Sequence, residues 1–154
     1  MNADKKILEH LNKLLGNEWA SIHQYFLHGH LQRDQGFNKL SDKIKSESAD
    51  EMNHAHWLAE RILMLNGIPN VQDMETLLIG KTVEEMLEND LQLEQNAIHY
   101  LQDSIAICQN ANDFTSRALL ERILVSEEAH ADYLKIQLKL IDQLGETQYL
   151  QTQI

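Results

Sequence analysis

Apolar residues recur every three or four positions along most of this chain, which is the spacing of one face of an α-helix. The pattern predicts four long helices and a short fifth one, over about residues 5–34, 40–66, 82–109, 114–144 and 147–154. Gly36, Gly67 and Gly145 stand where three of these patterns stop, as glycines often do at helix ends. Thr82 and Glu85 have the spacing of a capping box, which predicts the start of the third helix.

The lengths of the connections predict how the helices are arranged. Short links between the first and second helices, and between the third and fourth, make each pair an antiparallel hairpin. Residues 67–82 show no sustained period and are long enough to cross the molecule from end to end. We therefore expect an all-α, up-down-down-up four-helix bundle with one crossover, formed by residues 1–154 as a single domain. With one proline and six glycines in 154 residues, the composition agrees with a helical protein.

Each of the four helical stripes carries one glutamate in its middle, where an apolar residue is expected. In the third helix, for example, Glu94 lies between Leu91 and Ile98. Carboxylates that converge in a bundle core lose their hydration and repel one another, at a cost of several kcal/mol per ion unless a positive charge lies among them. The four central glutamates are Glu18, Glu51, Glu94 and Glu127.

These glutamates belong to a pattern that occurs twice, 76 residues apart. Glu18, Glu51 and His54 recur as Glu94, Glu127 and His130, and only His54 and His130 follow a glutamate by three residues. A glutamate and a histidine at that spacing share one helical face and can offer an oxygen and a nitrogen to one ion. For any one of these residues an exposed, solvated position is the usual outcome. For all six in one register, a site for two metal ions is the better interpretation.

Charge and cysteine content limit the other possibilities. Four Glu⁻ side chains balance two divalent cations, and carboxylate with imidazole suits iron or manganese, whereas structural zinc more often takes thiolates. The net charge of −11 argues against binding nucleic acid through its phosphates, although the same charge also serves solubility. The apolar runs are too short for a membrane span or a secretory signal, so we expect a cytoplasmic protein. Cys108 is the only cysteine and cannot form an internal disulfide.

Five segments spread over nearly the whole chain, together with the doubled pattern, carry a family resemblance. They are residues 11–18 (LNKLLGNE), 24–28 (QYFLH), 50–55 (DEMNHA), 60–63 (ERIL) and 149–151 (YLQ). They resemble the bacterioferritins, a branch of the ferritin-like di-iron proteins, whose bundles use one Glu from each of two helices and Glu-x-x-His from the other two.

The resemblance implies iron storage in a hollow shell of 24 subunits. It implies that Glu51 and Glu127 bridge two irons, that Glu18 and Glu94 are terminal ligands, and that His54 and His130 bind one iron each. The implied reaction is oxidation of Fe²⁺ by O₂ or H₂O₂, with ferric mineral stored in the cavity. The resemblance also leaves a second subunit type and a small ferredoxin reductant open as partners.

Tyr25 and Met52 are further candidates beside the six. Tyr25 lies two helical turns after Glu18 and is a candidate electron or hydrogen-bond donor, and Tyr133 is a weaker one; a role in packing is the alternative for both. In the family, a methionine at the position of Met52 ligates a haem b shared between two subunits. The alternative for Met52 is an ordinary apolar contact.

Several neighbouring residues complicate these expectations. Trp19, His23 and Trp57 depart from the residues of that face in the family, and the two indoles could crowd a haem. Glu47 and Asp50 could face the route to the cavity but are left out of the ligand set. The other six histidines are expected on the surface or in packing, with His28 and His30 as possible iron contacts at an interface. They are His10, His23, His28, His30, His56 and His99.

Two other classes of protein remain open from the sequence. A small DNA-protecting ferritin relative would also oxidise iron, but the acidic charge and the placement of all six residues within one chain count against it. A non-enzymatic helical assembly or haem-binding module would use the glutamates structurally and would not oxidise iron rapidly. An electron-transfer protein like rubrerythrin is weaker still, because it would need a site of four cysteines.

Overall fold

The computed structural model describes residues 4–154, which form five helices and no strand. In chain order the helices are α1 (Lys5–Asp34), α2 (Asn38–Met64), α3 (Val83–Asn110), α4 (Phe114–Leu144) and α5 (Glu146–Gln151). The all-helical prediction is confirmed, and most helix ends agree within two residues. The last helix is the exception, because it ends at Gln151 instead of running to the end of the chain. Within the described part, no helix has the length and apolar character of a membrane span.

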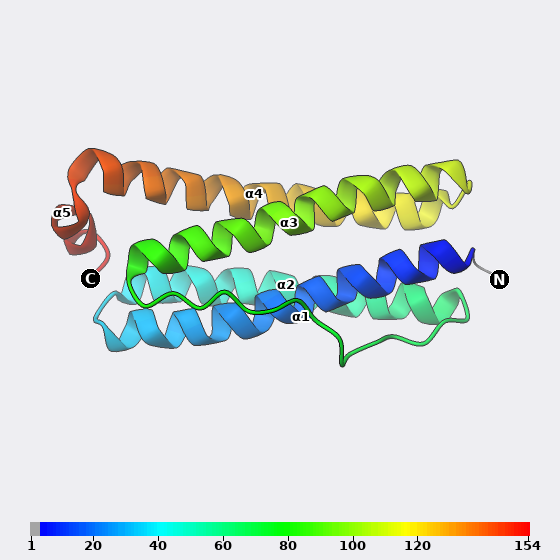
Figure 1. The fold of residues 1–154 in the computed structure, drawn as a ribbon, viewed down its shortest axis with the longest axis horizontal. Coiled ribbons are helices and arrows are strands. Elements are labelled where there is room, and N and C mark those ends of the chain that lie inside the picture. The colour runs from blue at the N-terminus through cyan, green and yellow to red at the C-terminus, as the bar shows by residue number, and fades with distance from the viewer. Residues whose placement is uncertain (1–3) are drawn as a thin grey trace.

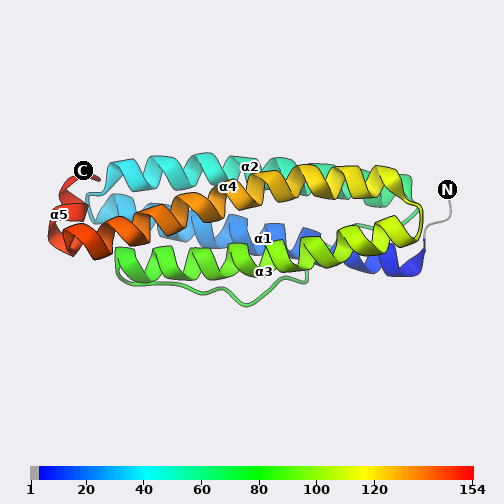
Figure 2. The same ribbon diagram turned by 90° about the horizontal axis from the view of Figure 1, so that it is seen from above.

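The bundle has the predicted up-down-down-up order (Figure 1). α1 packs against α2 and α3, and α4 packs against α3 and α2. Residues 65–82 form the crossover, which runs back along α1 from one end of the bundle to the other, as Figures 1 and 2 show. This long connection lets α2 and α3 point in the same direction.

Local hydrogen bonds set the two ends of the crossover. α2 stops early because Asn66 adopts a left-handed backbone with φ of 62°, and the N–H of Gly67 turns back to Ile62 O at 2.9 Å. At the other end, Thr82 Oγ1 accepts from the N–H of Glu85 at 3.2 Å, as the capping-box spacing predicts. The Glu85 carboxylate reaches the N–H of Lys81 at 2.9 Å, one residue before the usual partner. Both ends of the crossover are therefore fixed by capping.

The middle of the crossover is attached to the first half of α1. Asn12 Oδ1 accepts from the N–H of Asn70 at 2.7 Å, while Lys13 forms an ion pair with Glu75. Gly16 allows the closest approach, because a Cβ atom there would lie 2.7 Å from the carbonyl oxygen of Asp73. The crossover is thus a packed strap along the outer side of α1.

The apolar core consists of two clusters separated along the bundle. One includes Leu11, Leu58 and Ile123 towards one end, and the other includes Leu87, Leu134 and Tyr149 towards the end closed by α5. Tyr149 is fully buried and donates to Gln137 Oε1 at 2.7 Å, which holds α5 against α4. The middle of the bundle, between the two apolar clusters, is filled by polar side chains.

Candidate metal centre

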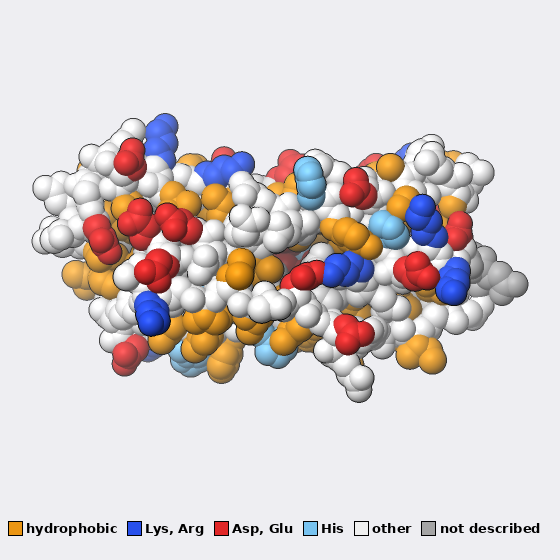
Figure 3. All heavy atoms as spheres, in the orientation of Figure 1, with side chains coloured by type: hydrophobic (Ala, Val, Ile, Leu, Met, Phe, Trp, Pro, Cys, Tyr) orange, Lys and Arg blue, Asp and Glu red, His pale blue; other side chains and the backbone are white. Residues whose placement is uncertain are grey.

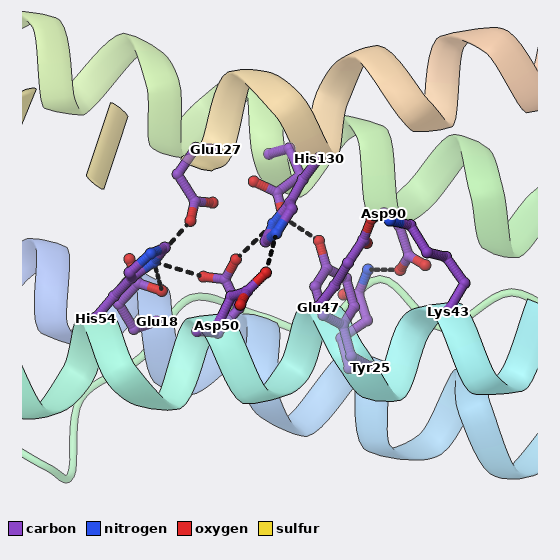
Figure 4. Close-up of polar contacts among 12 residues, drawn as sticks. Glu18, Tyr25, Lys43, Glu47, Asp50, His54, Asp90, Glu127 and His130 are labelled. Atoms are coloured by element: carbon purple, nitrogen blue, oxygen red, sulfur yellow. Dashed lines mark hydrogen bonds and ion pairs between the residues drawn. The ribbon is translucent and has the colours of Figure 1, made fainter. Parts of the chain in front are cut away.

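All four long helices contribute side chains to the polar middle of the bundle (Figure 4). α1 supplies Glu18, α2 supplies Glu51 and His54, α3 supplies Glu94, and α4 supplies Glu127 and His130. No one of these six is more than 5% exposed. The structure therefore places in one interior site all six residues that the doubled sequence pattern selects.

The six residues divide into two overlapping groups whose potential ligand atoms lie within 4.8 Å of one another. The first group is Glu18, Glu51, His54 and Glu127, and the second is Glu51, Glu94, Glu127 and His130. Glu51 and Glu127 belong to both groups. Each group therefore offers one ion three carboxylates and one imidazole, and two adjacent ions would share the same pair of carboxylates.

The two histidines contact glutamates across the bundle. His54 Nδ1 lies 2.9 Å from Glu127 Oε1, whereas the glutamate three residues before it, Glu51, is 3.7 Å away. His130 Nδ1 lies 2.8 Å from Glu51 Oε1 and 3.5 Å from Glu94 Oε1. Both imidazoles therefore direct Nδ1 towards the carboxylates at the centre.

Within the described part of the chain, most of the carboxylate oxygens at the centre have no hydrogen bond of good geometry, although Glu51 Oε1 and Glu127 Oε1 each form an ion-pair contact with a histidine. This holds for both side-chain oxygens of Glu51 and Glu127 and for Oε2 of Glu18 and Glu94. A buried carboxylate without partners costs several kcal/mol, so such a group is normally paired, protonated or bound to a cation. The carboxylate oxygens of each group converge within ligand distance of one another, which is the arrangement that a bound cation stabilises.

The pKa values of the carboxyl groups reflect the cost of holding four of them close together in the core. Burial, and then the charges of neighbouring glutamates, raise the pKa of Glu18 and Glu94 well above the ordinary value. Burial and the charge of Glu51 raise the pKa of Glu127. Burial acts in the same direction on Glu51, but its close polar contacts with Glu18, His130 and His54 outweigh burial and lower its pKa. Without metal, the centre therefore favours taking up protons in place of cations.

The histidine pKa values shift in the matching direction. Burial lowers the pKa of His54, but the adjacent Glu127 and Glu51 carboxylates outweigh this and raise it to about 9. For His130, burial is likewise outweighed by Glu51 and Glu94, and the pKa rises to about 12. Positive charge is strongly favoured at the positions that these two rings occupy.

Asp50 and Glu47 border the His130 side of the centre. Asp50 Oδ2 lies 3.0 Å from His130 Nε2, and its side chain is about half exposed at 51%. If Nε2 donates to this carboxylate, Nδ1 is left free to face the glutamates, as in many metal-bound histidines. Glu47 is buried, and burial raises its pKa to about 8. Sequence alone could not separate these two acids from ordinary solvated residues.

The two candidate tyrosines are in different environments. Tyr25 is buried and donates a hydrogen bond to Glu94 Oε1, which leaves Oε2 of that carboxylate unpaired. Burial and the Glu94 charge raise the pKa of Tyr25 well above its ordinary value, so the phenol stays protonated. Tyr133 packs against the apolar cluster at the α5 end, with Lys43 Nζ 4.9 Å from its ring centroid. Only Tyr25 touches one of the six residues.

Met52 and Trp57 lie on α2, whereas Trp19 and His23 lie on α1. Met52 is 38% exposed, on the face turned away from the buried Glu51. Trp19 and Trp57 are half-buried and pack against the apolar core, and Arg122 lies 3.9 Å from the centroid of the Trp57 ring. His23 is exposed, with Nδ1 2.6 Å from the carbonyl oxygen of Trp19.

The sequence did not reveal one group of buried polar residues. His28 is completely buried, with Nδ1 2.7 Å from Asp90 Oδ1 and Nε2 accepting from the N–H of Gly80 at 3.0 Å. His28 therefore has the packing role that was one of its two default expectations, and the possibility of an iron contact at an interface does not hold, because both ring nitrogens have partners within its own chain. His30, by contrast, is exposed beside Phe26. Asp90 gave no sequence signal, since its spacing to Glu94 is ordinary for two acids on a helix.

Comparison with known proteins agrees with the geometry of this centre. Residues 8–144 match the ferritin family, described as a ferritin-like domain. The chain is 44% identical over 149 residues to a bacterioferritin of Mycobacterium tuberculosis, covering 97% of this chain and 94% of the relative. It is 44% identical over 154 residues to a bacterioferritin of Streptomyces coelicolor, with coverage of 100% and 92%. A bacterioferritin of Brucella melitensis is 39% identical over 149 residues, with coverage of 97% and 92%.

Proposed function

Because this chain belongs to the bacterioferritins of the ferritin-like family, we propose that it oxidises Fe²⁺ at the candidate metal centre and stores the ferric product. One observation carries the proposal: two groups of buried ligand atoms overlap in Glu51 and Glu127. Each of these glutamates meets a histidine through Oε1 and has no hydrogen bond to Oε2 among the described residues. An overlap of this kind suits two ions held side by side and serves no evident structural purpose.

The proposed ligands follow the two overlapping groups. Glu51 and Glu127 bridge the two irons, Glu18 and His54 complete one site, and Glu94 and His130 complete the other. Four carboxylates balance the charge of two Fe²⁺ ions, and mixed oxygen and nitrogen ligands suit that metal. Among the described residues, no cysteine takes part in either group, as expected for a site that is not structural zinc.

The proposed reaction uses the two irons as a pair. Each Fe²⁺ gives one electron, so the pair reduces H₂O₂ with two protons to two waters, or O₂ with two protons to H₂O₂. Delivering two electrons together avoids a free one-electron oxygen radical. Tyr25 orients Glu94 through its hydrogen bond, and Asp50 orients His130. The protein thus contributes charge balance, positioning and exclusion of bulk water.

Storage is the second half of the proposal. Ferric product passes into the cavity of a shell of 24 copies and is held there as mineral. The net charge of −11 favours the approach of cations, and on the face in Figure 3 the Lys and Arg side chains are dispersed among acidic ones. Under this proposal the protein works in the cytoplasm, and a second subunit type and a small ferredoxin reductant are its further candidate partners.

Met52 is the residue that would hold a haem. Its side chain is 38% exposed, which leaves it accessible to a second copy of the chain. One Met52 from each of two subunits would hold a haem b, which would supply a route for electrons to the stored iron. A haem absorbance band that disappears in Met52→Leu, while the shell stays intact, tests this assignment.

Aerobic addition of Fe²⁺ to metal-free protein tests the main proposal. We expect oxidation much faster than in buffer, followed by elution of iron with a particle of about 24 subunits. Glu94→Ala should slow the oxidation, whereas Glu60→Ala, at an exposed position on α2, should not. Oxidation no faster than in buffer would favour the non-enzymatic assembly, and firm DNA binding at low salt would favour the DNA-protecting class.

A further inference from the structure

A buried polar group fastens the crossover to α1 and α3 and takes no part in the proposed iron chemistry. We call it the Gly80 attachment, and it consists of the side chains of Gln24, His28 and Asp90 with the backbone N–H groups of Leu78 and Gly80. The three side chains are at most 1% exposed. Figure 4 shows Asp90 beyond Tyr25, on the opposite side from His54 and Glu127.

The hydrogen bonds of the attachment define the state of His28. The N–H of Gly80 can only donate, so His28 Nε2, at 3.0 Å, must accept and carries no hydrogen. The hydrogen of the neutral ring is therefore on Nδ1, which donates to Asp90 Oδ1 at 2.7 Å. Every donor and acceptor on this ring is satisfied only while His28 is neutral.

The other half of the Gly80 attachment is held by Gln24, whose side chain does not change its charge. The amide of Gln24 donates to the same Asp90 oxygen at 2.8 Å, and its carbonyl oxygen accepts from the N–H of Leu78 at 2.9 Å. Two neighbouring backbone groups of the crossover are thus held by one side chain that can change its charge and one that cannot.

Protonation of His28 breaks one of these two bonds. A proton on Nε2 would face the N–H of Gly80, and that buried N–H would lose its acceptor, which is costly. Gly80 has little room to adjust, because a Cβ atom there would lie 2.5 Å from the backbone nitrogen of Met86. The bond from Nδ1 to Asp90 survives, so the change is confined to the crossover.

Few charged groups face His28. α3 contributes Asp90, the neighbour on α1 is the neutral Gln24, and α2 packs the apolar Ile44 against adjacent Gly29. Beyond Gly80, the crossover continues into Lys81, whose N–H donates to Glu85.

Asp90 is the competing site for a proton. Burial raises its pKa, and the hydrogen bonds from His28 and Gln24 offset only part of that rise. A test of His28 must therefore be separated from titration of Asp90.

We propose that the Gly80 attachment is acid-sensitive: protonation of His28 at Nε2 releases Gly80 and loosens the crossover, while Leu78 stays bound to Gln24. The loosened segment lies where α1 and α3 carry Tyr25 and Glu94, which gives the fold a way to couple acidity to mobility beside the metal centre.

Hydrogen exchange of the full-length protein between pH 8 and pH 5, corrected for the intrinsic pH dependence, tests this proposal. We expect the Gly80 amide to exchange about tenfold faster in acid, the effect of losing one buried hydrogen bond. His28→Gln keeps an acceptor for Gly80 and a donor for Asp90 but cannot titrate, so its acid step should disappear. The exposed His99→Gln should retain the step. A step that persists in His28→Gln, or no step in the natural sequence, would overturn the proposal.

A second measurement on the natural sequence decides the matter if His28→Gln does not fold. Exchange of the ring C2 hydrogen of His28, followed by mass spectrometry, gives the pH at which this ring titrates. The proposal requires that midpoint to coincide with the release of the Gly80 amide. Release at a pH where His28 keeps its charge unchanged would contradict it.

Discussion

Glu51 and His130 meet across the bundle, with Oε1 of the glutamate 2.8 Å from Nδ1 of the histidine. Glu127 and His54 form the mirrored contact at 2.9 Å. Each Glu-x-x-His motif therefore places its histidine on the glutamate of the other motif. This exchange brings the bridging candidates to the centre and makes the two halves of the site depend on each other.

The sharing of Glu51 predicts graded losses of metal. Glu51→Ala removes an oxygen donor from both groups, so we expect the binding of both ions to be lost or severely weakened. Glu18→Ala affects only the first group and should leave one ion bound. Anaerobic titration with Fe²⁺ or Co²⁺ measures the number of ions per subunit, with the exposed Glu60→Ala as the matched control. Equal effects of Glu51→Ala and Glu18→Ala would argue against bridging.

Asp50 should act through His130. Removing its carboxylate in Asp50→Ala frees the His130 ring to turn, and loss of such a supporting hydrogen bond typically lowers metal affinity about 10- to 100-fold. Asp50→Asn retains an acceptor oxygen and should restore most of the affinity. Asp42→Ala, at an exposed position on the same helix, serves as the control. Equal metal affinity in Asp50→Ala and the natural sequence would show that Asp50 does not support metal binding through His130.

Stability of the metal-free protein should fall as pH rises. The folded-state pKa values of Glu18 and Glu94 lie well above the ordinary value of 4.5, so the folded protein binds more protons than the unfolded chain. Their contribution is complete below pH 4.5 and is lost as pH rises through the folded-state values. His54, with its pKa raised from 6.5 to about 9, adds a loss of the same sign above pH 6.5.

Thermal unfolding between pH 5 and pH 8 checks this dependence. The lowered pKa of Glu51 has the opposite effect on stability, but it is one group against three whose pKa values are raised, Glu18, Glu94 and His54. We expect metal-free protein to have a higher melting temperature at pH 5 than at pH 8. In the double variant Glu18→Gln with Glu94→Gln, the melting temperature should depend less on pH. Adding Fe²⁺ without oxygen at pH 8 should restore the melting temperature. A metal-free protein that is more stable at pH 8 than at pH 5 would show that the repulsion among the buried carboxylates is offset by something other than bound protons.

Sequence periodicity was sufficient to find the six central residues, because a helix of known period fixes which positions share a face. The connection lengths likewise sufficed for the up-down-down-up order. The end of α2 was predicted less well, since Asn66 takes the left-handed conformation before Gly67 can. The end of a helix depends on the backbone conformation of single residues such as Asn66.

Contacts made by the crossover could not be predicted. Residues 65–82 have no period, so their path along α1, and with it the partners of His28, appears only in the structure. The pairing of His130 with Asp50 is a similar case, because it joins α4 to a half-exposed residue of α2. Periodicity identifies which face of a helix is buried, but not which residue on another helix it meets.

Gly16 tests the packing of the crossover. In Gly16→Ala the new Cβ would lie 2.7 Å from the carbonyl oxygen of Asp73, so the strap must shift. Alanine is the better helix former, yet overpacking of this kind costs about 1–3 kcal/mol, and we expect net destabilisation. Urea unfolding measures it, with Glu9→Ala at an exposed position on α1 as the control. Gly16→Ala with unchanged or increased stability would show that the crossover is loosely attached there.

Anomalous diffraction at the iron edge, from crystals loaded with Fe²⁺ in the absence of oxygen, shows whether each subunit holds two irons that share Glu51 and Glu127. We predict two iron peaks per subunit, with Glu51 and Glu127 ligating both, Glu18 and His54 on one, and Glu94 and His130 on the other. A single peak, or two peaks that share neither Glu51 nor Glu127, would contradict the paired-iron account.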